Sequence, residues 1–349
     1  MKQGFLTLAL SASTLLAAAP LMAGPIGYGA GTTGGGSKAA VNVSTMAAMQ
    51  AAIDAYSGSG GLVLNYTGKF DYASITDVCA QWQKDPQTVN IKNKSDVTIR
   101  GAADSSANFG LHIVGDAHNI IVQNMTIGLL PGGEMADSIS IEGNSTGKPS
   151  HIWIDHNTIF ASLTACAGAG DASFDGGIDS KKGANAITIS YNYVYNYQKV
   201  SLNGYSDKDT LNAGATTTYH NNRFEHVKSR LPLQRFGKTH IFNNYFGNVG
   251  TSGINVRMDG MSLIEANYFE NVANPVTSRD SSKIGYWELK GNYVGTGITW
   301  DTPSGAVNAT NWATTKAFGS TGYSYTAAAA SGVKAKAIAT AGARTGLAQ

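Results

Sequence analysis

The sequence predicts an all-β chain folded as a right-handed parallel β-helix, with a short N-terminal capping helix and an irregular C-terminal segment. Short β-branched or aromatic runs recur between about residues 60 and 300, and Asn, Gly or Asp closes each run. No helical pattern of useful length interrupts these runs. Strand-like runs lead into an asparagine at Asn124, Asn157, Asn192, Asn222, Asn244, Asn267 and Asn292.

The spacing of these asparagines favours a solenoid. The last three gaps are 22, 23 and 25 residues, and the earlier gaps are 33, 35 and 30 residues. A period near 22 without helices is typical of β-helix coils, so longer gaps indicate coils with an inserted loop. Asparagine tolerates left-handed backbone at a turn, and stacked asparagines can bond to one another in a ladder. An ordinary β-sandwich with Asn-rich turns is the alternative.

The N-terminal region predicts a secretory signal peptide. Lys2 precedes an apolar run over residues 5–19, and cleavage is expected after Ala23. A retained membrane anchor is the alternative, although the run is short and rich in Ala and Ser. We therefore expect a secreted protein in which residues 1–23 are removed and residues 24–349 form a single domain.

Three further segments complete the expected organisation. Residues 24–40 are rich in Gly, Ala and Thr and are expected to form a mobile leader. Residues 43–56 predict a short amphipathic helix with Ser44 or Thr45 as its N-cap. The Ala-, Thr- and Gly-rich segment from Asp301 is expected to pack along the outside of the coil or to cover its end.

Composition limits the partners of the protein. The formal net charge is +2, which is too small to indicate a nucleic-acid partner. No stretch after the signal peptide is long and apolar enough to span a bilayer. We expect a monomer with no membrane partner. The two cysteines suggest one disulfide in an exported protein, with two buried free thiols as the alternative.

Four aspartates form the first candidate cluster: Asp137, Asp171, Asp175 and Asp179. In a flat strand, residues four apart are ~13 Å from each other, which is too far for both to bind one calcium ion. Two glycines lie between Asp175 and Asp179 and permit a bend, so this segment predicts a turn that presents two carboxylates. A solvated acidic loop is the alternative.

Three basic residues form the second cluster: Lys199, Arg230 and Arg235. Lys199 lies seven residues after Asn192, and Arg230 lies eight after Asn222, which predicts nearly equivalent places on neighbouring coils. Coils are ~4.8 Å apart, so the two cations disfavour each other's charge. This arrangement favours an anion-binding or catalytic site, with a basic solvated face as the alternative.

Four long motifs are spread over the middle of the chain: IWIDH at 152–156, FDGGIDSKKG at 174–183, YNYVYNYQKV at 191–200 and RLPLQRFGKTHIFNNY at 230–245. They resemble motifs of the extracellular pectate lyases of polysaccharide lyase family 1. The resemblance extends from about residue 60 to 300. It implies calcium-dependent cleavage of α-1,4-polygalacturonate by β-elimination, which gives 4,5-unsaturated oligogalacturonates.

The resemblance also implies roles for individual residues. Arg230 matches the catalytic base, and the substrate-binding positions are matched by Lys199, Arg235 and Lys181. The calcium-ligand positions are matched by Asp137, Asp175 and Asp179, while Asp171 matches a ligand of an additional ion. Cys79 and Cys166 match a family disulfide.

The chain departs from the family pattern beside Asp137. Some relatives place a second aspartate two residues earlier, where this chain has Met135, preceded by Glu134. The site is therefore expected to hold three carboxylates, or Glu134 to act as the fourth. His156, His220 and His240 are expected to be buried and structural rather than catalytic.

Three rival functions remain at this stage. A polygalacturonase needs paired carboxylates around the scissile bond, whereas here they accompany a lysine and two arginines. A pectin lyase acts on neutral methylated chains, which do not call for acidic calcium ligands. A non-catalytic carbohydrate-binding protein or adhesin on the same fold is the third.

Overall fold

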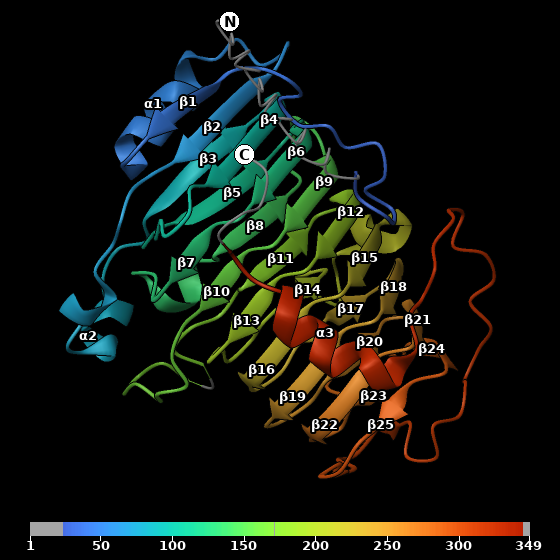
Figure 1. Ribbon diagram of the computed structural model, residues 1–349. Coiled ribbons are helices and arrows are strands. Elements are labelled where there is room, and N and C mark those ends of the chain that lie inside the picture. The colour runs from blue at the N-terminus through green and yellow to red at the C-terminus, as the bar shows by residue number, and fades with distance from the viewer. Residues whose placement is uncertain (1–23, 171, 345–349) are drawn as a thin grey trace, which may run out of the picture.

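The computed structural model describes residues 24–344 except residue 171, and within this part the chain coils into a parallel β-helix. Three sheets run along the coil, and from β6 onward successive turns of the chain add strands to all three of them (Figure 1). Pairing between neighbouring strands is parallel except at the C-terminal end, where β26 pairs with β23 in the antiparallel direction.

The strands divide among the three sheets as follows. The ten-stranded sheet contains, in spatial order, β1 (Ala40–Val43), β2 (Leu62–Tyr66), β4 (Ser95–Gly101), β6 (His118–Gln123), β9 (Ser150–Asp155), β12 (Asn185–Ser190), β15 (Thr216–His220), β18 (Lys238–Phe242), β21 (Met261–Glu265) and β24 (Tyr286–Lys290). The nine-stranded sheet contains β3 (Thr88–Lys92), β5 (Gly110–Val114), β8 (Ile139–Glu142), β11 (Ile178–Lys181), β14 (Leu202–Asn203), β17 (Leu233–Arg235), β20 (Ile254–Arg257), β23 (Val276–Ser278) and β26 (Val307–Asn308). The seven-stranded sheet contains β7 (Thr126–Gly128), β10 (Thr158–Phe160), β13 (Tyr193–Tyr195), β16 (Arg223–Val227), β19 (Tyr245–Val249), β22 (Tyr268–Val272) and β25 (Tyr293–Val294).

The predicted asparagine ladder is present inside the coil. The amide of Asn192 donates to the side chain of Asn222 at 3.0 Å, and Asn222 donates to Asn244 at 2.9 Å. The same side-chain bond joins each further pair from Asn157 to Asn292. All of these asparagines except Asn292 are buried, and the bonds supply partners for their polar groups inside the coil.

Asn124 was wrongly included in this ladder. The side chain of Asn157 accepts from the backbone N–H of Met125, so Met125 occupies the place that asparagine holds on later coils. Asn124 lies one residue earlier and has a φ of 56°, as do His156 and Tyr191 with φ values near 50°. The residue with left-handed backbone is therefore the one before the ladder position. Because asparagine can occupy either position, an asparagine in the sequence does not by itself identify a ladder member.

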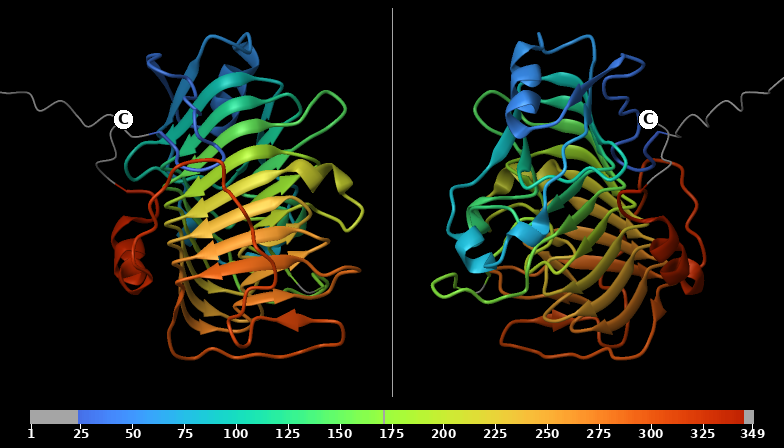
Figure 2. Two further views of the ribbon diagram at one scale, coloured as in Figure 1. Left: turned by 90° about the vertical axis from the view of Figure 1, so that its right-hand side faces the viewer. Right: turned by 60° about the vertical axis from the view of Figure 1, so that its left-hand side comes forward.

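The predicted capping helix is present as α1 (Met46–Ala55). The hydroxyl of Thr45 accepts from the N–H of Ala48 at 3.1 Å, which makes Thr45 the N-cap. Met49 and Ile53 are buried, and they pack into the core at the first coil. Figure 2 shows α1 covering the N-terminal end of the stacked strands.

The expected mobile leader is instead docked on the ten-stranded sheet. The backbone N–H of Tyr28 bonds to the hydroxyl of Thr218 at 3.0 Å, and the N–H of Gly29 bonds to the hydroxyl of Thr188 at 3.0 Å. A Cβ at Gly29 would lie 2.9 Å from the carbonyl oxygen of Ile152, so glycine allows this close approach. Threonines at matching positions of neighbouring strands thus hold the segment in place.

The C-terminal segment packs on the outside of the coil as expected, but it is not wholly irregular. It contains α3 (Val333–Thr340), where Val333 and Ala337 bury against Tyr245 of the seven-stranded sheet. A second short helix, α2 (Val78–Trp82), lies in a loop where no helix was predicted. No described helix is long and apolar enough to cross a membrane.

Candidate active site

Three of the four predicted aspartates surround one cavity on the outer side of the nine-stranded sheet. Asp179 belongs to β11, Asp137 precedes β8, and Asp175 lies before the bend at Gly176, where φ is 80°. A Cβ at Gly176 would lie 1.8 Å from a carboxylate oxygen of Asp137, so glycine is required at this bend. The cavity has a volume of about 390 Å³ and is lined by Asp137, Glu142, Asp175, Asp179, Lys181, Lys182, Leu202, Tyr205 and Arg230. The turn predicted from the two glycines therefore does bring the carboxylates together.

Asp179 is the most buried of these carboxylates. Its side chain is 3% exposed, and one oxygen accepts from the N–H of Leu202 at 3.0 Å. Burial raises the pKa of Asp179, and the neighbouring carboxylate of Asp137 raises it further. Lys181 offsets part of this cost, because its ammonium contacts Asp137 and lies 3.5 Å from Asp179. Burial lowers the pKa of Lys181, but the two aspartates outweigh burial and raise it above the usual range.

Two of the three predicted basic residues meet at Asp175. Lys199 donates to one oxygen of Asp175 at 3.3 Å, and Arg230 donates to the other at 3.1 Å. Lys199 pairs across neighbouring coils with Asp175 on one side and Ser229 on the other, which confirms the nearly equivalent places of Lys199 and Arg230. Arg230 has a φ of 66°, the left-handed conformation that also occurs at other turns of the coil, such as His156 and Tyr191.

Arg235 lies on β17, five residues after Arg230, and it is held by a different carboxylate. Its Nε donates to Asp207 at 2.7 Å, and its Nη1 donates to the carbonyl of Gly204 at 3.0 Å. Arg257 lies directly beside it on β20. Burial lowers the pKa of Arg257 to about 10, and the charges of Arg235 and Arg230 also lower it. Arg257 thus extends the predicted basic cluster of Lys199, Arg230 and Arg235 by one further coil.

The remaining predicted positions fall in three groups. Asp171 and the side chain of Glu134 lie outside the described residues, whereas Met135 is described and is 80% exposed. The predicted histidines lie at or beside strands of the ten-stranded sheet, away from the cavity. His220 and His240 are buried as expected. His156 is only partly buried, and it bonds to Asp155 at 2.6 Å.

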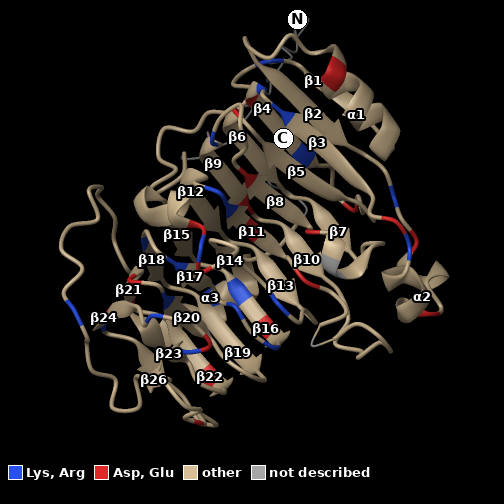
Figure 3. Cartoon of the chain, turned by 180° about the vertical axis from the view of Figure 1, so that it is seen from behind, with Lys and Arg blue, Asp and Glu red and all other residues tan. Residues whose placement is uncertain are grey.

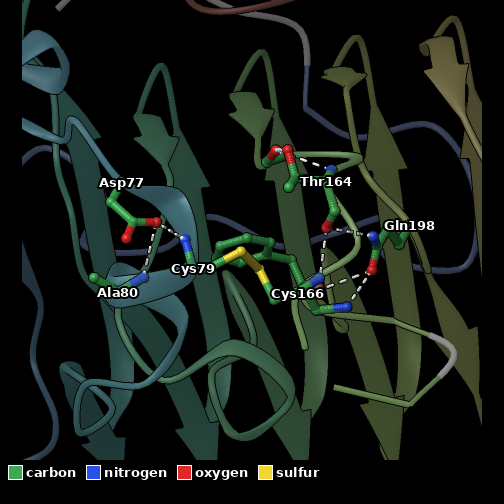
Figure 4. Close-up of a disulfide and its surroundings, with 9 residues drawn as sticks. Asp77, Cys79, Ala80, Thr164, Cys166 and Gln198 are labelled. Atoms are coloured by element: carbon green, nitrogen blue, oxygen red, sulfur yellow. Dashed lines mark hydrogen bonds between the residues drawn. A yellow bond between two sulfur atoms is a disulfide. The ribbon is translucent and has the colours of Figure 1, made fainter. Parts of the chain in front are cut away.

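The predicted disulfide joins Cys79 of α2 to Cys166, with their Cα atoms 5.4 Å apart (Figure 4). The N-terminus of α2 is capped by Asp77, whose carboxylate accepts from Cys79 and Ala80. A larger cavity of about 810 Å³ lies beside this helix. It contains none of the predicted site residues, so we place the site at the smaller, charged cavity.

The sequence analysis missed four residues of this region: Glu142, Tyr205, Asp207 and Arg257. Glu142 bonds to Lys182 and lies 3.6 Å from His112 at the rim of the cavity. Arg257 could have been found from its spacing, since it follows Arg235 by 22 residues, one coil length. Tyr205 and Asp207 lie in a loop that has no periodic signal. Figure 3 shows charged positions of both signs on the middle strands of the coil.

The carboxylates of Asp137, Asp175 and Asp179 suit calcium, although in this structure cationic side chains are bound to them. Among the described residues, no group of three or more His, Cys, Asp or Glu side chains is arranged to hold a metal ion. The ammonium of Lys181 instead contacts both Asp137 and Asp179. Carboxylate oxygens are the ligands that calcium prefers, and the buried Asp179 between two other carboxylates calls for a cation. Calcium therefore fits these residues once Lys181 turns away.

Carboxylates and basic side chains gathered along an outer sheet of a β-helix suit the binding of an acidic polysaccharide. The family model for pectate lyase matches residues 3–345. Pectate lyase 1 of Pectobacterium carotovorum is 41% identical over 94% of this chain and 93% of its own length. The chain belongs to the pectate lyase family and is a lyase.

Solved structures agree with this assignment. Pectate lyase II from Xanthomonas campestris is 70% identical, covers 93% of this chain and 100% of its own, and superposes with a TM-score of 0.92. Pectate lyase C from Erwinia chrysanthemi, solved with Ca²⁺, is 39% identical over 93% of this chain and 97% of its own, with a TM-score of 0.85. A variant of pectate lyase C, in complex with pentagalacturonic acid, is 38% identical over the same shares, with a TM-score of 0.83. The predicted right-handed parallel β-helix is thereby confirmed.

Proposed function

We propose that this pectate lyase requires calcium and cleaves α-1,4-linked polygalacturonate by β-elimination, which gives 4,5-unsaturated oligogalacturonates. The observation that carries the proposal is the sharing of Asp175. Lys199 and Arg230 both contact this carboxylate in the cavity that Asp137 and Asp179 also line. Carboxylates and cations side by side can hold a uronic acid through a bridging metal ion and through direct ion pairs.

The acidic residues form the proposed calcium site. Asp137, Asp175 and Asp179 supply the oxygen ligands, and Asp171 is proposed as a ligand of an additional ion that binds with the substrate. When bound, calcium withdraws electron density from a uronate carboxylate and so makes the proton on the adjacent C5 more acidic. Support comes from the donor set described above and from the relative that was solved with Ca²⁺.

The basic residues bind the substrate and move the proton. Lys199 and Arg235 bind uronate carboxylates, and Lys181 joins them when it leaves its aspartates. Arg230 takes the C5 proton as the base, the C4–O bond breaks, and its electron pair leaves on the oxygen, which takes a proton from solvent. The C–H electrons form the C4=C5 double bond, and no water is added. A guanidinium group is protonated near neutrality, so turnover is expected to rise at alkaline pH.

Export and assembly complete the proposal. Residues 1–23 act as a signal peptide that directs the protein out of the cell, and they lie outside the described residues. Residues 24–349 then form a single domain that acts as a monomer on polygalacturonate. Binding of pentagalacturonic acid by a 38% identical relative supports this substrate.

An ultraviolet assay with polygalacturonate tests the function directly. The unsaturated product absorbs in the ultraviolet, whereas hydrolysis or binding alone produces no such absorbance. We expect absorbance to rise with the purified enzyme, to stop when a chelator is added and to return with excess calcium. Chelator-resistant activity that prefers methylated pectin would indicate a pectin lyase instead.

A further inference from the structure

One carboxylate joins three segments of the chain that are far apart in the sequence. Asp207 lies in the loop of residues 204–209, after β14, and one of its oxygens accepts from Arg235 Nε at 2.7 Å. Its other oxygen accepts from the N–H and hydroxyl of Ser282 at 2.9 and 3.1 Å and from the hydroxyl of Ser281 at 3.2 Å. Asp207 therefore fixes Arg235 and the loop between β23 and β24 to the same point.

These contacts determine how Arg235 presents its guanidinium. Its Nε is held by Asp207 and its Nη1 by the carbonyl of Gly204, so the plane of the group is set from one side. A guanidinium has five N–H donors, so further Nη donors remain for a ligand. The side chain of Arg235 is 12% exposed, which leaves it little freedom to adopt other orientations.

Asp207 also counters repulsion among neighbouring cations. Arg257 is paired with Arg235 across adjacent strands, and both arginines belong to the same side of the sheet. Without a carboxylate, the Arg235 guanidinium is expected to turn away from the buried Arg257. Partial burial opposes ionisation of Asp207, but its bonds from Ser282 and Arg235 hold its pKa at about 2, so it stays charged.

The loop of residues 204–209 also contributes the aromatic ring of Tyr205 to the cavity. Tyr205 lies two residues before Asp207, lines the cavity with Arg230 and Asp179, and is 50% exposed. The ammonium of Lys182 lies 5.7 Å from the centre of its ring. The anchor at Asp207 thus holds the loop that contributes Tyr205 to the cavity.

We propose that Asp207 is a positioning residue for substrate binding, which fixes the orientation of the Arg235 guanidinium and keeps the 204–209 loop bound to Ser281 and Ser282. The inference rests on the proposed function, in which Arg235 binds a uronate carboxylate. Asp207 itself does not touch the substrate. Its effect on binding passes through Arg235.

A double-mutant cycle tests this route of action. Asp207→Ala should raise KM for polygalacturonate about tenfold while kcat changes less, since loss of one charge-assisted hydrogen bond corresponds to a factor of this order. Asp207→Asn should recover part of the loss, because its amide oxygen can still accept from Arg235. In an Arg235→Ala background, Asp207→Ala should add no further increase in KM.

The matched control is Asp259→Asn, which weakens the surface pair with Lys283 in the same loop, 3.3 Å apart, and should leave KM unchanged. Thermal melts of all variants report folding. The proposal would be overturned if the KM increases of Asp207→Ala and Arg235→Ala multiplied in the double variant. It would also be overturned if Asp207→Ala left KM unchanged or lowered it. The cycle is repeated with calorimetric binding of trigalacturonate. A wild-type enzyme that forms no unsaturated product removes the proposed function, while the binding cycle still decides the role of Asp207.

Discussion

Lys199 and Arg230 share a single carboxylate, with Lys199 bound to one oxygen of Asp175 and Arg230 to the other. Two cations from successive coils thus converge on one anion at the edge of the cavity. This arrangement keeps both positive charges close to the place where a uronate carboxylate is proposed to bind.

Replacement of Arg230 tests the proton-transfer role. Arg230→Lys should lower kcat by at least about 100-fold, because general-base contributions are of this size or larger. The fold should be unaffected, since the long side chain and its contact with Asp175 can be retained. Ultraviolet assays of turnover and a thermal melt measure the two effects. Nearly full activity in this variant would remove Arg230 from the base role.

Calcium binding should be visible without turnover. Calcium at 100 times its Kd is expected to stabilise the native protein by about 2.7 kcal/mol, measured as a rise in Tm during a titration. Asp179→Asn should abolish this rise, because Asp179 lies between the other two proposed ligands. Asp259→Asn, on the surface, serves as the control. An equal rise in Tm in both variants would contradict the assignment of Asp179.

Loss of the disulfide should lower stability. Replacement of Cys79 and Cys166 by serine is expected to cost about 2–5 kcal/mol in the free energy of unfolding, since the link closes a long loop. Urea unfolding gives the value. Activity of the folded fraction should persist, because neither cysteine lines the proposed active-site cavity. Complete loss of turnover in folded protein would show that this loop contributes to the site.

The asparagine ladder should be sensitive to a single deletion. Asn222→Ala leaves the backbone N–H of Asn192 without its acceptor inside the coil, while the side-chain amide of Asn192 keeps its bonds to the carbonyls of Ile154 and Ser190. An unpaired buried group costs about 1–3 kcal/mol, so a loss of about 2 kcal/mol in unfolding free energy is expected. Urea unfolding of Asn222→Ala is compared with that of the exposed Asn311→Ala. Similar stability of both variants would show that the ladder contributes little.

Stability should fall at acidic pH because of two buried histidines. Burial lowers the pKa of His220 to about 4 and of His240 to about 3, below the usual 6.5. The unfolded chain therefore binds protons first, so this stability is complete above pH 6.5 and is lost as pH falls toward 4 and then 3.

Urea unfolding between pH 7.5 and 4.5 measures the effect. The slope should approach about 1.4 kcal/mol per pH unit for each histidine below pH 6. His240 accepts from or donates to the hydroxyl of Tyr323 at 2.6 Å and lies 3.9 Å from Glu265. His240→Gln should reduce the slope, with the exposed His118→Gln as the matched control. A slope unchanged by His240→Gln would assign the acid sensitivity to other groups.

The solenoid could be predicted because its main signal is periodic. Burial of aliphatic residues and of one asparagine per coil repeats at intervals that sequence alone reveals. The register error at Asn124 arose because the left-handed position beside the ladder accepts many residue types, including His156 and Ala266. An asparagine in that position therefore resembles a ladder member.

The site was predictable where its residues follow the period of the coil. Lys199 and Arg230 could be placed from their distance to Asn192 and Asn222. The contact of Arg235 with Asp207 could not, because Asp207 lies in an inserted loop whose conformation depends on Ser282, 75 residues away. Docking of residues 24–40 was missed for the same reason, since its partners are distant threonines such as Thr218.

The helix α1 affects how readily these molecules associate through exposed strand edges. A coil of parallel strands has no intrinsic stopping point, because each exposed edge offers the same backbone pairing as the interior. By burying Met49 and Ile53 and bonding through Gln50 to the backbone of Asn90, α1 covers the first edge of the nine-stranded sheet at β3. We expect a chain lacking residues 46–55 to expose this edge and to associate more readily with other strands.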